Sequence, residues 1–309
     1  MGVAALFIFT LSLFTSCTDT QWQHNDGLVF GTVYSITYQY GEDLQADIDA
    51  ELAKVDQEFS MFNEQSTVAR INRGDSTVER SPMFEEVYQL AQMVNADTNG
   101  AFDITVAPLV NAWGFGFKHE QMPTPQQVDS LLKIRSQMDF SAIAKGYGCD
   151  AVARMLQSKG IDNYMVDIGG EVVVRGYSPR SSDWRIGVNK PVEDSLSVNE
   201  ELQAVLSLTD IAMATSGNYR NFYYKGGRKY AHTIDPRTGY PVQHNILSAT
   251  VLADNCAKAD AYATSFMVLG LDSAQLLLSQ HPDLKAYLIY TDEDNNLTVW
   301  HSPELKIED

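Results

Sequence analysis

Cysteine is scarce in this chain. Among its 309 residues only Cys17, Cys149 and Cys256 are cysteines, and none of them belongs to a CxxC pair or a Cys/His cluster. A disulfide framework and a cysteine-based zinc site are therefore excluded. A single bridge between Cys149 and Cys256 stays open, although isolated cysteines are more often buried free thiols.

Positive charge is also in short supply. The chain has 22 Lys and Arg against 40 Asp and Glu, a net charge of −18. This field would repel a nucleic-acid backbone, so general nucleic-acid binding is disfavoured. It also opposes small phosphate-bearing ligands, whose site would need a local Lys, Arg or metal ion. Hydrophobic residues make up 44% of the chain, enough for a sizeable core.

The uncharged, mostly apolar run at the start is too short for a comfortable transmembrane helix. Residues 1–16 suit the hydrophobic region of a signal peptide. Leu13-Phe14-Thr15-Ser16-Cys17 resembles a bacterial lipoprotein cleavage box, with Phe where Leu is usual and no charged segment before it. We expect lipidation of Cys17, a polar tether over residues 17–26, one domain over 27–309, and a lipid anchor on the extracytoplasmic face of the inner membrane. The alternative is an ordinary secretory signal.

Apolar periodicity predicts helices and strands in separate blocks. No linker, repeat or low-complexity segment divides them, and residues 60–74 look irregular. Blocks rather than alternating βαβ units indicate the α+β class, in one catalytic domain that could have two lobes. The expected helices are 44–59, 82–98, a short one from 124, 144–159, 255–269 and 273–280; the expected strands are 28–30, 32–38, 164–168, 172–177, 184–188, 203–208, 211–215, 286–290 and 297–300.

Asp103 lies inside the apolar run GAFDITVAPLV. A buried carboxylate needs hydrogen bonds, which a ligand could donate. Capping of a helix that starts near Val106 is the other explanation. The segment WGFGF that follows alternates glycine with aromatic residues and could admit a flat ring, or could simply be core.

Lys145 stands at the start of a predicted helix, in FSAIAKGYG. A cation together with free backbone N–H groups at a helix N-terminus makes an anion site. Gly146 and Gly148 lower helix propensity, so we expect them to leave room for a diphosphate. The alternative is a solvated lysine on a loosely capped helix. Gly169-Gly170, after a predicted strand, reads as a tight turn.

Two further positions could carry chemistry. His232 precedes the turn sequence DPRTG and could act as a base near neutral pH, although a lone histidine before a turn is more often structural. Asp260 and Thr264 are four residues apart on a predicted helix, so their oxygens face one way. Carboxylate and hydroxyl oxygens suit a hard cation such as Mg²⁺. Thr264 could instead bond its own backbone.

Six segments occur here in a distinctive order: GAFDITVAPLVNAWGFG, FSAIAKGYG, VDIGGE, ATSGNY, HTIDPRTGYPV and ADAYATS. In this order they resemble the FAD:protein FMN transferases, the ApbE-type flavin transferases, over about residues 28–290. The resemblance implies a T-fold-like α+β enzyme that binds FAD and Mg²⁺ and cleaves the FAD diphosphate. FMN would be joined through its phosphate to a Thr or Ser of a target protein, and AMP released.

The resemblance also implies roles for individual residues. It places the base at His232, Mg²⁺ ligands at Ala142 (through its carbonyl), Asp260 and Thr264, and FAD contacts at Phe30, Phe62, Ala101, Phe102, Asp103, Asp139, Lys145 and Ile234.

Two positions depart from the family pattern. Phe30 stands where Met is usual, and Phe62 where many members have Tyr, a position linked to the balance between FMN transfer and FAD hydrolysis. The runner-up activity is thus a FAD pyrophosphatase that yields FMN and AMP. A non-catalytic flavin-binding lipoprotein, or a domain with an unrelated ligand, are alternatives of other classes. The expected partner is an extracytoplasmic acceptor protein, such as a subunit of a membrane redox complex.

Overall fold

The computed structural model describes residues 21–116, 122–134, 137–191, 201–218, 222–225 and 228–308. Residues 1–16 and Cys17 lie outside these ranges, so the predicted signal peptide and the predicted lipidation remain predictions. In chain order the elements are β1 (Trp22–Val29), β2 (Thr32–Gln39), α1 (Gln45–Phe59), α2 (Thr67–Asn72), α3 (Pro82–Asp97), the 3₁₀ helix η1 (Ile104–Val106), α4 (Ala107–Ala112), α5 (Pro125–Leu131), α6 (Ala144–Ser158), β3 (Tyr164–Ile168), β4 (Glu171–Arg175), β5 (Trp184–Asn189), β6 (Leu202–Leu208), β7 (Ile211–Gly217), β8 (Phe222–Lys225), β9 (Arg228–Ala231), β10 (Ile246–Ala253), α7 (Cys256–Leu269), α8 (Leu271–Gln280), β11 (Lys285–Thr291), β12 (Leu297–His301) and β13 (Ile307–Glu308).

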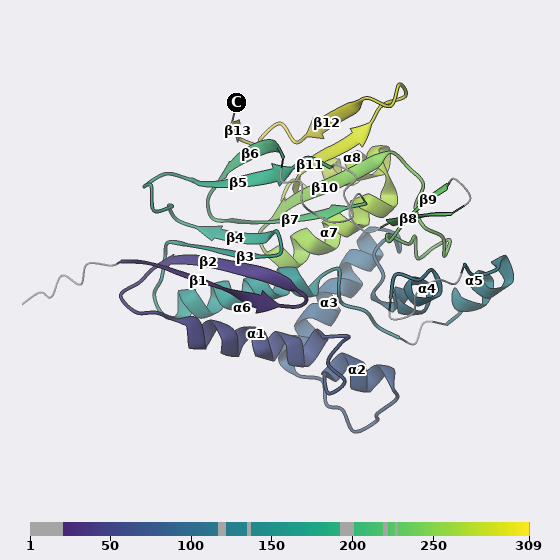
Figure 1. The fold of residues 1–309 in the computed structure, drawn as a ribbon, viewed down its shortest axis with the longest axis horizontal. Helices are drawn as coiled ribbons and strands as arrows, with labels where there is room; N and C mark the ends of the chain where they lie inside the picture. The colour runs from purple at the N-terminus through teal and green to yellow at the C-terminus, as the bar shows by residue number, and fades with distance from the viewer. Residues whose placement is uncertain are drawn as a thin grey trace, which may run out of the picture.

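An antiparallel sheet runs through the middle of the molecule (Figure 1). Its strand order is β1-β2-β3-β4-β7-β10-β11-β12. Alternation in β2 turns Tyr34, Ile36 and Tyr38 toward the core. The antiparallel pairing brings the β1–β2 turn, the β3–β4 turn and the end of β7 to the same end of the sheet. This confirms the α+β class.

Different layers cover the two faces of the sheet. Helices α1, α6 and α7 pack on one face, and the small sheet β13-β6-β5 covers the other (Figure 1). Helix α7 lies inside the molecule, because most of its residues are buried. Asp260 is a buried carboxylate on this helix and therefore demands partners.

The helix boundaries follow local signals that the sequence carries. Ser81 accepts a hydrogen bond from the N–H of Phe84 and Pro82 opens α3, while Thr124 forms a capping box at α5. Gly160 follows α6 with φ +78°, in the left-handed region that glycine adopts without strain. The predicted starts of these helices are confirmed.

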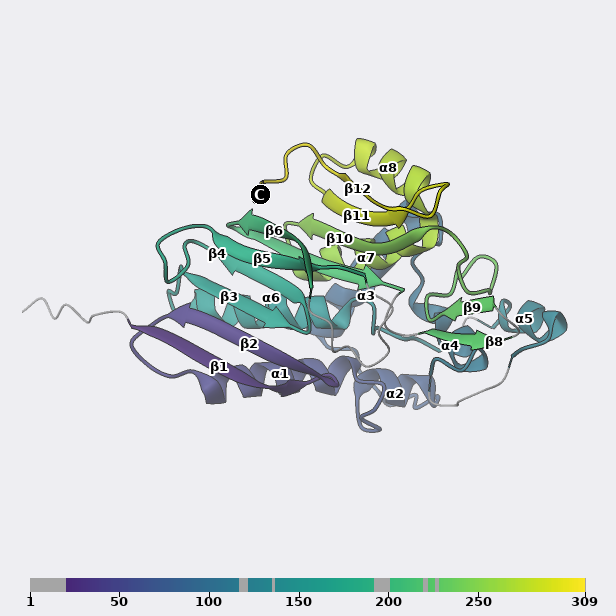
Figure 2. The same cartoon turned by 45° about the horizontal axis from the view of Figure 1, so that its top comes forward.

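A smaller lobe stands at one side of the main body. It contains α4, α5, β8 and β9 (Figure 2). A separate apolar cluster around Leu109, Trp113, Val128 and Ile234 holds it together, and the Trp113 indole donates to the carbonyl of Gly239 at 2.7 Å.

The structure corrects or completes the sequence predictions at four points. Residues 60–74 are not wholly irregular, because α2 forms there with Ser66 as its cap. Strands β8, β9, β10 and β13 were not predicted. The expected tether cannot extend to residue 26, because β1 begins at Trp22. Cys149 and Cys256 are buried free thiols, not a disulfide. Among the described helices none is long and apolar enough to cross a membrane.

Candidate active site

A cavity of about 530 Å³ opens where the end of the central sheet meets the smaller lobe. Its size lies in the range of ordinary ligand pockets. The residues predicted for the site gather in it: Phe62, Ala101, Phe102, Asp103, Asp139, Ala142, Lys145, His232, Ile234, Asp260 and Thr264 all line this cavity.

Phe30 is the exception. It lies in the β1–β2 turn with φ +52° and lines a second pocket, between this turn and the end of α1. Its ring sits against Gly148, where an added Cβ would come within 2.8 Å of the Phe30 ring. The structure thus does not bring Phe30 into the main cavity, and its predicted flavin contact stays a prediction.

The charged centre of the cavity is formed by Lys145, Glu171 and Asp260. Lys145 Nζ lies 2.5 Å from Glu171 Oε1, and both carboxylates are almost fully buried. Burial raises the pKa values of Glu171 and Asp260, against the opposing effect of Lys145. Among the residues that the structure describes, Glu171 Oε2 finds no hydrogen-bond partner. Two buried carboxylates thus share one lysine, and the cavity is short of positive charge.

Lys145 and its neighbours are not arranged as a free anion site. The N–H of Gly146 donates to Asp260 Oδ2 at 3.1 Å, so this helix-terminal donor is already used. A Cβ on Gly146 would lie 2.3 Å from the carbonyl oxygen of Cys256. Gly146 and Gly148 therefore permit close packing of α6 on α7 and on Phe30, and the expectation that they clear space for a diphosphate is wrong.

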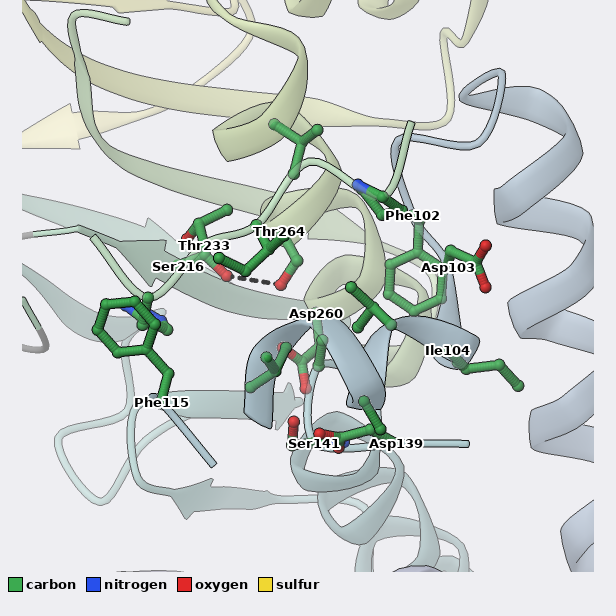
Figure 3. A pocket seen from close by; sticks show the side chains of 18 of the residues that line it. Phe102, Asp103, Ile104, Phe115, Asp139, Ser141, Ser216, Thr233, Asp260 and Thr264 are labelled. Atoms are coloured by element: carbon green, nitrogen blue, oxygen red, sulfur yellow. Dashed lines mark hydrogen bonds between the residues drawn. The ribbon is translucent and has the colours of Figure 1, made fainter. Parts of the chain in front are cut away.

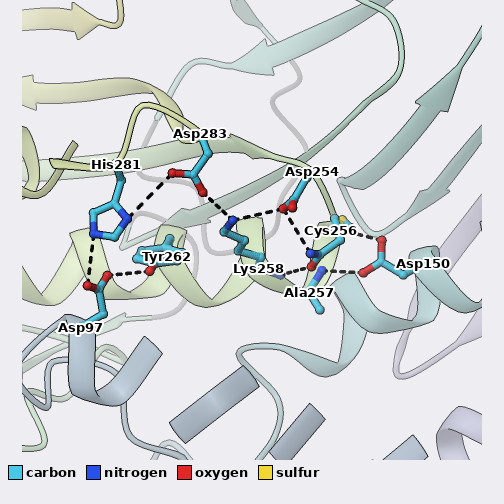
Figure 4. A network of polar contacts seen from close by, with 10 residues as sticks. Asp97, Asp150, Asp254, Cys256, Ala257, Lys258, Tyr262, His281 and Asp283 are labelled. Atoms are coloured by element: carbon cyan, nitrogen blue, oxygen red, sulfur yellow. Dashed lines mark hydrogen bonds and ion pairs between the residues drawn. The ribbon is translucent and has the colours of Figure 1, made fainter. Parts of the chain in front are cut away.

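Asp150 ties the same two helices together from the other side. Its carboxylate accepts from the N–H groups of Cys256 and Ala257 at 2.8 Å each, at the N-terminus of α7 (Figure 4). Burial raises the pKa of Asp150 to about 6, against these two hydrogen bonds. Because α6 carries Lys145 and α7 carries Asp260, this contact helps set their relative position.

The three predicted metal ligands line the same cavity. Asp260 and Thr264 project from α7 into the cavity, and the Thr264 hydroxyl pairs with Ser216 at 3.0 Å (Figure 3). Within the described residues no group of three or more His, Cys, Asp or Glu is placed to hold a metal ion. The oxygens of Asp260, Thr264 and the Ala142 carbonyl nonetheless fit a hard cation whose remaining ligands are water or phosphate oxygens.

Asp103 and Asp139 occupy two loops that are joined to each other. The N–H of Asp139 donates to the carbonyl of Ile104 at 2.6 Å. Asp103 caps η1 through the N–H of Thr105, as the alternative interpretation expected, and Asp139 accepts from the N–H of Ser141. Figure 3 shows Asp139 beside Ser141 below Asp260, and Asp103 on the other side of Phe102.

His232 approaches from the smaller lobe, in the loop after β9. Its ring packs edge-on against Phe115, with centroids 6.4 Å apart. The loop is held at the next residue, because Thr233 Oγ1 donates to Asn218 Oδ1 at 2.6 Å and Thr233 O accepts from Val242. The turn that follows closes as predicted, with Gly239 at φ +78°.

Among the cavity residues to which sequence reasoning gave no role, two contact predicted site residues through polar groups: Glu171 pairs with Lys145, and Ser216 with Thr264. Glu171 stood within the motif VDIGGE without a role, and Ser216 within ATSGNY. Glu171 directly follows a glycine turn and begins an apolar strand, where an unpaired charge would be costly. This pattern could have indicated that Glu171 has a charged partner.

Buried carboxylates, one lysine and a histidine around an oxygen-rich cavity define a site suited to a phosphate-bearing ligand and a hard cation. The ApbE family matches residues 30–288. The chain is 35% identical to the FAD:protein FMN transferase of Vibrio cholerae (92% of each chain covered) and 34% identical to that of Haemophilus influenzae (96% of this chain and 94% of that one). The chain therefore belongs to the ApbE family.

Solved structures agree with this assignment. The flavin transferase ApbE from Vibrio cholerae is similar with a TM-score of 0.80 and 33% identity, covering 92% of this chain and 98% of that one. The flavinyl transferase ApbE from Pseudomonas stutzeri has a TM-score of 0.80 at 26% identity, covering 95% and 97%.

Proposed function

We propose that this chain is an enzyme that transfers FMN from FAD to a Thr or Ser hydroxyl of an acceptor protein and releases AMP. The relatives carry the name FAD:protein FMN transferase and match most of the chain. The observation that carries the proposal is that nearly every residue expected to contact FAD, metal or acceptor lines one cavity.

The charges of the cavity support a need for a divalent cation. Asp103, Asp139, Glu171 and Asp260 line it, and Lys145 is the only Lys or Arg among the lining residues that the structure describes. A dianionic diphosphate would be repelled unless a cation compensated the carboxylates. Asp260, Thr264 and the Ala142 carbonyl would hold Mg²⁺, which when bound neutralises charge on the diphosphate as a Lewis acid.

The transfer step would use His232 as the base. His232 takes the proton of the acceptor hydroxyl while that oxygen forms a bond to the FMN-side phosphorus of FAD. The bond from this phosphorus to the bridging oxygen breaks, and AMP leaves with that oxygen. A positioned base contributes about 10²–10⁴-fold to such a step. Lys145 would bind the diphosphate, and Glu171 would hold Lys145 in place.

A FAD pyrophosphatase is the second candidate, because the same site could use water. The observation that favours it is Phe62, which is 83% exposed, lines the cavity and has no hydroxyl. A pure flavin binder accounts less well for a histidine in the cavity.

The location of the enzyme belongs to the same proposal. Lipidation of Cys17 would hold it at the extracytoplasmic face of the inner membrane, near acceptors such as redox-complex subunits. Cell fractionation tests this, because Cys17→Ser should move the protein from the membrane to the soluble fraction.

Two measurements test the proposed function. In a titration FAD should bind more tightly than FMN, because Asp103, Asp139 and Lys145 are predicted to contact both halves of the dinucleotide. After incubation with FAD, Mg²⁺ and a candidate acceptor, the intact mass of the acceptor should increase by one FMN phosphoryl unit. Equal affinity for FMN and FAD, with no mass gain, would contradict the proposal.

A further inference from the structure

The tip of the β1–β2 hairpin exposes two large apolar side chains. Leu28 is 83% exposed and Val33 is 62% exposed. They are register partners across the hairpin, so they lie side by side on one face of it. The alternate residue Tyr34 turns to the opposite face and is buried against α1. Adjacent exposed apolar side chains form a small patch, and an apolar patch beside a ligand site is a candidate contact surface.

This tip borders the active-site cavity. The N–H of Gly169, a residue that lines the cavity, donates to the carbonyl of Val33 at 3.0 Å. A Cβ on Gly169 would lie 2.8 Å from the Thr32 side chain, so the two turns are in contact.

The 60–63 loop makes a second connection. Phe62 lines the cavity, and the next residue, Asn63, lines the pocket that also includes Leu28. The hairpin tip and the cavity are therefore also linked along the chain by the neighbouring residues Phe62 and Asn63.

We propose that Leu28 and Val33 form a docking surface for the acceptor protein and contact apolar side chains that flank its reacting hydroxyl. The inference rests on the proposed function, since only an enzyme with a protein acceptor needs a surface there. The occupant follows from position: the acceptor hydroxyl must reach the cavity, and its neighbouring residues must then cross the rim that Val33 shares with Gly169.

The spacing of the sheet indicates which acceptor residues make the contact. Strands β2 and β1 lie about 5 Å and 10 Å from β3, and an extended peptide advances about 3.3 Å per residue. Residues about two to four positions from the modified Thr or Ser should therefore meet Val33 and Leu28.

The test uses a pooled synthetic peptide library with one Thr and varied residues at the flanking positions, incubated with FAD and Mg²⁺. FMN adducts are identified by mass spectrometry, and AMP release is measured in parallel. The variant is Leu28→Thr/Val33→Thr, which keeps strand propensity. The control is Leu297→Thr, an exposed leucine at the other edge of the same sheet. Thermal unfolding verifies that both variants fold.

Wild type and Leu297→Thr should favour apolar residues two to four positions from Thr, by about tenfold over polar ones. The double variant should lose this preference while transferring FMN to polar-flanked peptides at the wild-type rate. An unchanged preference in the double variant would overturn the docking surface alone. AMP release without an adduct on any peptide, in wild type, would overturn the transferase function and the docking surface with it.

Discussion

Lys145 Nζ lies 2.5 Å from Glu171 Oε1, and this ion pair joins the start of α6 to the turn that begins β4. Burial lowers the pKa of Lys145, but the nearby carboxylates of Glu171 and Asp260 outweigh this effect and raise it above its ordinary value. The lysine therefore stays charged in the cavity. Glu171 thus fixes the position of this cation before a diphosphate binds, and the diphosphate would share the lysine with Glu171.

Replacement of Lys145 should weaken FAD binding. Lys145→Gln keeps an N–H donor for Glu171 but removes the charge, so the buried carboxyl is not left without a partner. We expect the Kd for FAD to rise about tenfold to a hundredfold, because hydrogen bonds to charged groups contribute about 1.5–3 kcal/mol. Fluorescence titration measures this, with the exposed Lys54→Gln as control. Equal affinities for wild type and Lys145→Gln would show that the lysine does not contact FAD.

Asp260→Ala should abolish Mg²⁺-dependent turnover. The variant leaves only a hydroxyl and a carbonyl from the predicted ligand set, which cannot hold Mg²⁺ against water. The matched control is Asp254→Ala, which removes an exposed carboxylate just before the same helix. AMP release at several Mg²⁺ concentrations, and in excess EDTA, measures the effect. Full activity of Asp260→Ala, or of wild type in EDTA, would refute the metal assignment.

Gly146→Ala should destabilise the fold, because the new Cβ would lie 2.3 Å from the backbone carbonyl oxygen of Cys256. Separating α6 from α7 should lower the free energy of unfolding by about 1–3 kcal/mol, the usual effect of overpacking. Urea denaturation measures this. Gly41→Ala is the control, because nothing lies within 4 Å of a Cβ there. Equal stability of the two variants would show that the helices are not in such close contact.

The stability of the protein should depend on pH through Asp150. Burial raises its pKa from the ordinary 3.8 to about 6, so folding favours the protonated carboxyl. This contribution is present below about pH 4 and is lost as the pH rises toward 6, by about 3 kcal/mol in all. Asp150→Asn removes the titrating group and should flatten this part of the profile. Parallel stability profiles of wild type and Asp150→Asn between pH 4 and 6 would contradict the shifted pKa.

The periodic signal was clearest in long elements with one face toward solvent. The pattern Leu44, Ile48, Leu52, Val55 and Phe59 identified α1, and all but its first residue lie within the helix. Strand β10 was missed because it lies inside the sheet and is buried on both faces, so it shows no alternation. Helix α2 was missed because its six residues are too few for a periodic signal.

The role of each site residue was harder to predict than which residues belong to the site. The order of the motifs indicated that distant residues such as Asp103 and Asp260 belong to one site, and both line the same cavity. Local sequence could not show what lies opposite a residue. Gly146 was predicted to leave room for a ligand. Its actual neighbour, the carbonyl of Cys256, lies more than a hundred residues later in the sequence and could not be anticipated. The partner of Lys145 was missed for the same reason.

The most direct test of FMN transfer compares AMP released with FMN attached in one reaction. Wild type with FAD, Mg²⁺ and an acceptor protein should give equal amounts of AMP and of acceptor carrying FMN, by chromatography and intact mass. His232→Ala should keep FAD affinity but lose about 10²–10⁴-fold in rate, because the hydroxyl is no longer deprotonated. AMP released by wild type without FMN on the acceptor would contradict the transfer and identify a hydrolase, and transfer by His232→Ala at the wild-type rate would contradict the base.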